Sequence, residues 1–179
     1  MPAVCLSCGC DEPRRIRQEI AVADAAALRP DERVLIAAED TLALAETWIG
    51  WNGCAVMSLG NAWTPAKALR RIEDHLIDHL CQIETRATGA ASVGDPWRGR
   101  SITLDADWAR FTEADLDEAS ARLRRLAQVM ALRLRALEPR WDDHAGDEWT
   151  IRSIAEHVAD AMRVYASRPA ATALVPPPA

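Results

Sequence analysis

The chain has 179 residues, a net charge of −6 and 49% apolar residues. This length fits one domain with at most a small appendage, and the apolar share is ample for a core. The acidic balance argues against a nucleic-acid-binding surface. No apolar run approaches the roughly 20 residues that span a bilayer, and the N-terminus lacks the features of a secretory signal. We therefore expect a cytoplasmic protein, without nucleic-acid or membrane partners, and the strong preference for arginine over lysine suggests a bacterial source.

Residues 1–13 form a cysteine-containing tail with the pattern Cys-x-x-Cys-x-Cys, which comprises Cys5, Cys8 and Cys10. In a reducing compartment this pattern indicates a second metal site or a redox site. A closed zinc or iron–sulfur site needs four ligands, so the fourth would come from Asp11, Cys54, Cys81 or another chain. The alternative is a flexible tail that bears thiols. Cys54 and Cys81 themselves stand alone in apolar surroundings, so we expect them to be buried thiols.

The next part of the chain, residues 14–61, is expected to form a small appendage. Residues 14–29 are Ala-rich and fit a short helix or a partly ordered arm. The apolar run 33–38 is compatible with a buried strand, residues 40–49 have helical spacing, and residues 54–59 fit a second strand. Together these segments suggest a β-α-β unit at the N-terminal end of a mainly α protein.

The rest of the chain shows three long helices with clear ends. The first begins at an N-cap Thr64 followed by proline and ends at Gly89. The second begins at Thr112, with an acidic residue three positions later as in a capping box, and stops before Pro139. The third begins at Thr150. These helices make the C-terminal two-thirds of the chain mainly helical, and the Pro-rich tail 169–179 is expected to be disordered.

One pattern occurs twice in these helices. Residues 70–78 and 152–160 both follow the order Arg, any residue, Ile, two residues ending in an acid, His, an aliphatic, any residue, Asp. The first copy adds His79 one turn after His75, and residues four apart lie on the same face of a helix. With His157 from the second copy, the pattern predicts a three-histidine site for zinc, nickel or iron that leaves positions open for water or substrate.

A ligating imidazole needs an acceptor on its other nitrogen, and the acids of the repeat are candidates for this second-shell role: Asp74, Asp78, Glu156 and Asp160. The alternative is that the histidines are ordinary core or surface residues. The zinc-protease motif is excluded because Leu76 follows His75 where that motif requires glutamate. The catalytic residues are therefore left unassigned. His144, in a loop, is at most an accessory base.

Two segments resemble the DinB-like (YfiT-type, damage-inducible) superfamily. Residues 148–160 look like its signature helix, in which a Trp followed by Ser or Thr stands eight residues before a histidine ligand, as Trp149 stands before His157. Residues 71–83 are similar to the family's other ligand helix, which carries His-x-x-x-His and often a following Gln. The resemblance covers roughly residues 62–168, and it implies an up-down four-helix bundle with a divalent ion held by three histidines at one end.

The order of the two ligand helices is reversed relative to most of the family, as in a permuted arrangement. Only three long helices are evident in residues 62–168, so the resemblance requires a fourth helix from the N-terminal third, for which residues 40–49 are the candidate.

The resemblance also implies a function. Some relatives use a low-molecular-weight thiol, such as mycothiol or bacillithiol, in S-transfer or isomerisation, and family members often dimerise. We therefore expect a metal-dependent thiol transferase or isomerase that acts on a small molecule, and a homodimer. Arg70, Arg71 and Arg152 are candidates for binding a substrate carboxylate, although helix arginines are usually only solvated. Two alternatives stay open: a non-catalytic metal-binding stress-response protein, and a redox or interaction module that uses the cysteine tail.

Overall fold

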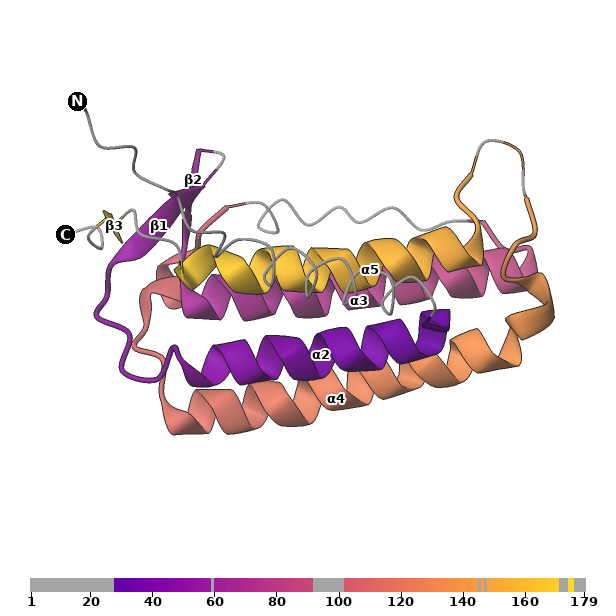
Figure 1. Ribbon diagram of the computed structural model, residues 1–179. Coiled ribbons are helices and arrows are strands. Elements are labelled where there is room, and N and C mark those ends of the chain that lie inside the picture. The colour runs from indigo at the N-terminus through magenta and orange to yellow at the C-terminus, as the bar shows by residue number, and fades with distance from the viewer. Residues whose placement is uncertain are drawn as a thin grey trace, which may run out of the picture.

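A computed structural model of the protein describes residues 28–58, 60–91, 102–144, 146, 148–170 and 174–175. Within these residues four long helices form a bundle (Figure 1). They are α2 (Pro30–Glu46), α3 (Pro65–Thr88), α4 (Glu113–Ala136) and α5 (Ile151–Ser167). The prediction of a mainly α bundle with a small appendage is confirmed. The cysteine tail and nearly all of the segment 14–29 lie outside the described residues.

The helices pack so that α2 contacts α4 and α5, and α3 contacts the same two helices. In Figure 1, α3 runs beside α5 and α2 runs beside α4. The core between them is made of fully buried aliphatic side chains from all four helices, which include Val34, Ile72, Leu76, Leu123, Met130, Ile154 and Met162. Among the described residues, none of the helices has the combination of length and apolar character that a bilayer crossing requires.

The prediction of a strand over residues 33–38 is wrong, because this run lies inside α2. Pro30 occupies the first turn of the helix, where its missing N–H costs nothing, and Asp31 and Glu32 place negative charge at the helix N-terminus. The buried side chains of α2 also follow helical spacing, from Val34 to Ala45. Over six residues the apolar run resembles a strand, but over seventeen its period is that of a helix. α2 is the fourth bundle helix, which begins ten residues before the segment 40–49 proposed for it.

The three other helices begin where the sequence predicts. The hydroxyl of Thr64 accepts from the backbone N–H of Lys67, and that of Thr150 accepts from Ser153. Thr112 and Asp115 cap each other's backbone N–H groups, as in the predicted capping box. Helix α3 ends at Gly89, whose φ of +70° is a left-handed conformation that glycine adopts without strain.

A small antiparallel sheet lies at the end of the bundle where α3 begins and α5 ends (Figure 1). Its order is β2-β1-β3, with β1 (Ala55–Ser58) between β2 (Asn61–Trp63) and β3 (Leu174–Val175). The strand expected near residues 54–59 is confirmed. The β-α-β unit is wrong, since α2 belongs to the bundle. Leu174 and Val175, which were expected to be disordered, supply a strand.

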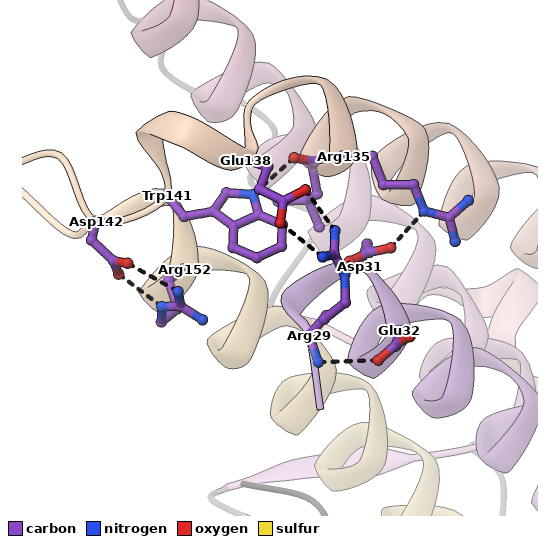
Figure 2. Close-up of polar contacts among 9 residues, drawn as sticks. Arg29, Asp31, Glu32, Arg135, Glu138, Trp141, Asp142 and Arg152 are labelled. Atoms are coloured by element: carbon purple, nitrogen blue, oxygen red, sulfur yellow. Dashed lines mark hydrogen bonds and ion pairs between the residues drawn. The ribbon is translucent and has the colours of Figure 1, made fainter. Parts of the chain in front are cut away.

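The start of α2 is tied to the end of α4 by the charged network in Figure 2. The carboxylate of Asp31 is 1% exposed, and it accepts from Arg29 at 3.1 Å and from Arg135 at 2.5 Å. Arg29 also donates to both oxygens of Glu138, and its guanidinium lies 4.9 Å from the centre of the Trp141 ring. Burial opposes the ionisation of Asp31, but hydrogen bonds from the two arginines outweigh it and hold its pKa below the usual range.

Candidate functional site

The packing of α3 against α5 brings the three predicted histidines together. His75 and His79 are one turn apart on α3, and His157 faces them from α5. The Nε2 atoms of His75 and His157 are 3.0 Å apart. One ring nitrogen from each of the three histidines lies within 4.8 Å of the other two. Among the described residues, these side chains therefore form a group that could hold a metal ion.

The rings are arranged as ligands of one ion would be. Their centres are 4.4 Å (His75–His79), 4.9 Å (His75–His157) and 5.1 Å (His79–His157) apart. With metal–nitrogen bonds of about 2.0–2.1 Å, ligand nitrogens are about 2.9–3.4 Å apart and imidazole centres about 4.5–5.2 Å apart. The ring positions thus already match a common ion. The widest of the nitrogen separations, which reach up to 4.8 Å, exceeds the range around a bound ion.

The site lies at the α3–α5 interface, beside the apolar core. His75 is 7% exposed, and His79 and His157 are half-buried. All three stand near the middle of their helices, whereas the family resemblance implies a site at one end of the bundle. His79 and His157 are partly exposed, so the site is not sealed from solvent.

A glutamine that is not part of the repeated pattern orients one of the candidate ligands. Nδ1 of His79 lies 2.8 Å from Oε1 of Gln82. Because Oε1 can only accept, Nδ1 carries the proton and Nε2 keeps its lone pair for an ion. Gln82 follows His79 by three positions on the same helix, so the spacing alone could have identified it.

The four acids proposed for the second shell have varied surroundings. Asp74 accepts a hydrogen bond from Arg71, and Asp160 lies 3.7 Å from the guanidinium of Arg163. Glu156 adds negative charge near Arg152. A second-shell role for these acids and for Asp78 stays a prediction.

Trp149 covers one side of the site. Its ring centre is 4.8 Å from that of His157 in an edge-to-face arrangement, and the side chain is 48% exposed. Its backbone carbonyl accepts a hydrogen bond from Arg86 of α3. The tryptophan therefore lies against a candidate ligand and faces solvent.

The remaining candidates are the cysteines and His144. Cys5, Cys8 and Cys10 lie outside the described residues. The expectation of two buried thiols is wrong, because Cys54 is half-buried and Cys81 is exposed. His144 is exposed in the loop before α5.

The candidate carboxylate-binding arginines are already engaged with acids. Arg70 donates to Asp107 at 2.9 Å, and Arg152 donates to Asp142 at 2.7 Å. Arg71 pairs with Asp74. Its guanidinium also lies 5.5 Å from the ring centre of Tyr165, which is itself 5.7 Å from the ring centre of His75.

Comparison of the chain with protein-family models, with curated proteins and with solved structures gives no match. The case for a metal centre therefore rests on the geometry of the three histidines.

Proposed function

We propose that the chain is an enzyme that depends on a divalent metal ion bound by His75, His79 and His157. One observation carries this proposal. Three imidazoles from two helices have ring nitrogens within 4.8 Å of one another, although His75 and His157 are 82 positions apart in the chain. Histidines brought together on a partly buried face repel when protonated, and they gain little from one another when neutral. A shared cation gives such a cluster a favourable free energy.

The ligand set favours zinc, nickel or iron, because imidazole suits these borderline metals. Three protein ligands leave at least one coordination position open, which distinguishes catalytic from structural sites. The ion would supply Lewis acidity, which lowers the pKa of a bound thiol or water. Gln82 would fix the tautomer of His79, and Trp149 would shield His157 from bulk solvent while leaving the open side accessible.

The family resemblance supports a more specific proposal, in which the second substrate is a low-molecular-weight thiol such as mycothiol. Two features named by the resemblance are side-chain neighbours of the ligands: Trp149 contacts His157, and Gln82 contacts His79. The reaction would be an S-transfer or a thiol-assisted isomerisation of a small molecule. The competing function is a metal-binding stress-response protein without turnover.

Cobalt substitution tests both parts of the proposal. We expect Co²⁺-loaded protein to show the visible bands of a four- or five-coordinate ion, and addition of mycothiol or glutathione to produce a near-ultraviolet thiolate-to-cobalt band. His157→Ala should lose both signals, and His144→Ala should keep both. Cobalt bands without a thiolate band would contradict the thiol reaction and favour the non-catalytic alternative. Bands that persist in His157→Ala would contradict the site itself.

A further inference from the structure

A second polar cluster lies next to the histidines. It consists of two aromatic and three cationic side chains, which we call the cation cluster: Trp63, Lys67, Arg71, Tyr165 and Arg168. The rings of Trp63 and Tyr165 are stacked with centres 5.5 Å apart and planes 13° apart. The guanidinium of Arg168 lies 4.1 Å from the Trp63 ring centre and 5.2 Å from that of Tyr165. The aromatic pair thus forms a platform on which a cation is held.

The other two cations reach the same platform from α3. Lys67, the single lysine of the sequence, has 0% exposure, and its ammonium is 4.8 Å from the Trp63 ring centre and 2.9 Å from the hydroxyl of Thr103. Arg71 is 7% exposed, with its guanidinium 5.5 Å from the Tyr165 ring centre. Long cationic side chains are almost never this buried unless they are paired or bind something.

Two members of the cation cluster, Arg168 and Trp63, have polar groups that the described part of the chain does not satisfy. Arg71 pairs with Asp74, but Arg168 has no carboxylate partner there. The indole N–H of Trp63 is also buried without an acceptor among the described residues. A buried donor without an acceptor costs free energy, and an acceptor that carries negative charge would satisfy the Trp63 N–H and also pair with the half-buried Arg168.

The pKa of Lys67 reflects its burial first and the positive charge of its neighbours second. Burial, together with the charges of neighbouring arginines, lowers the pKa of Lys67 to about 8, against an opposing contribution from Asp107. Arg70, Arg71 and Arg168 are those neighbours. An anion bound among these groups would favour their charged forms.

The cation cluster is continuous with the histidine site. Four polar side chains stand at four-residue intervals on α3: Lys67, Arg71, His75 and His79. Each interval corresponds to about 6 Å along the helix axis. Tyr165 links the two groups, because its ring centre lies 5.5 Å from the guanidinium of Arg71 and 5.7 Å from the ring centre of His75.

We propose that the cation cluster binds an oxyanion, a carboxylate or a phosphate, carried by the molecule that reaches the three histidines. The description of this molecule as the substrate rests on the proposed metal-dependent function, whereas anion binding itself does not. The donors of Lys67, Arg168 and Trp63 would contact the anion, while its reacting group would extend one or two helical turns toward His75.

Titration of chelator-treated, metal-free protein tests the anion site. Inorganic phosphate and succinate would each be added at constant ionic strength, with chloride as the reference anion, and binding would be followed by calorimetry and by tryptophan fluorescence. We expect saturable binding of at least one of the two anions, weakened at least tenfold in Arg168→Gln and in Lys67→Met. Arg163→Gln is the matched control, because Arg163 stands on α5 only five positions before Arg168 and its guanidinium instead pairs with Asp40.

The outcomes separate the two anions and the two proposals. Binding of phosphate alone would assign a phosphate ester, and binding of succinate alone would assign a carboxylate. No saturable binding, or equal binding in wild type and folded Arg168→Gln, would overturn the anion site. Circular dichroism checks the fold of each variant, and Arg168→Gln decides alone if Lys67→Met is unfolded. Metal content is measured separately, so anion binding without metal uptake would contradict only the metal-dependent function.

Discussion

The Nε2 atoms of His75 and His157 lie 3.0 Å apart, although 82 positions separate the two residues in the chain. Two neutral imidazoles cannot both direct lone pairs at each other, so either one nitrogen carries a proton or a cation lies between them. Protons and metal ions therefore compete for the same two nitrogens, and metal affinity should fall as the solution becomes acidic.

Substitution of Gln82 should weaken metal binding without unfolding the protein. In Gln82→Ala the Nδ1–H of His79 loses its acceptor, and loss of such a partner typically lowers metal affinity about 10–100-fold. Competition with a chromophoric chelator would measure the change. Gln82→Glu should retain the affinity, because a carboxylate also accepts from Nδ1.

The control for this pair of variants is Gln128→Ala, which changes an exposed glutamine on α4 far from the histidines in the chain. Its metal affinity should equal that of wild type. Equal affinities for Gln82→Ala and Gln128→Ala would show that Gln82 does not orient a ligand.

Asp31 should stabilise the fold in a pH-dependent way. Its folded pKa lies below the value of about 3.9 in an unfolded chain, so its contribution is complete above about pH 5. The contribution is lost as the pH falls through the folded pKa. At pH 7, Asp31→Asn should lower the free energy of unfolding by about 1.5–3 kcal/mol, since the carboxylate charge and one of its two acceptor oxygens are lost. Urea unfolding at several pH values would measure this difference.

Asp40 gives the matched control, because its ion pair with Arg163 is on the surface. Asp40→Asn should cost less than about 1 kcal/mol at any pH. A stability difference between wild type and Asp31→Asn that stays constant from pH 7 to pH 3 would contradict the lowered pKa of Asp31.

Lys67 should make the fold more stable at alkaline pH. Its pKa is about 8 in the folded chain and 10.5 as its ordinary value, so between these values the unfolded chain binds more protons. The free energy of unfolding of wild type should therefore rise relative to Lys67→Met across this window, by up to about 3 kcal/mol. Urea unfolding of both proteins at pH 7.5 and pH 10 measures the effect, and parallel pH dependences would contradict it.

Much of the fold could be predicted from local sequence signals. The N-terminal ends of α3, α4 and α5 are set by the N-cap residues Thr64, Thr112 and Thr150, which act through hydrogen bonds within one turn. Helix α2 was divided incorrectly, because its apolar run from Val34 to Ala38 has no polar residue to reveal the helical period.

The histidine site could also be predicted from local sequence spacing, whereas the cation cluster could not. A pair of histidines four residues apart lies on one helix face, and the repeated pattern pointed to the third. The cation cluster depends on contacts of Trp63 with Tyr165 and Arg168, about a hundred positions away, for which no local rule exists. The four-residue spacing of Lys67, Arg71, His75 and His79 was the one available signal.

The central claim is that the three histidines bind one ion, and metal content measured by mass spectrometry tests it most directly. Wild type would be compared with His79→Ala, His157→Ala and the control His144→Ala, and with a variant in which Cys5, Cys8 and Cys10 are serine. We expect about one divalent ion per chain in wild type, in the His144 control and in the cysteine variant, and none in His79→Ala or His157→Ala. Metal that persists in both of these histidine variants, or wild type that takes up no zinc, nickel or iron on reconstitution, would contradict it.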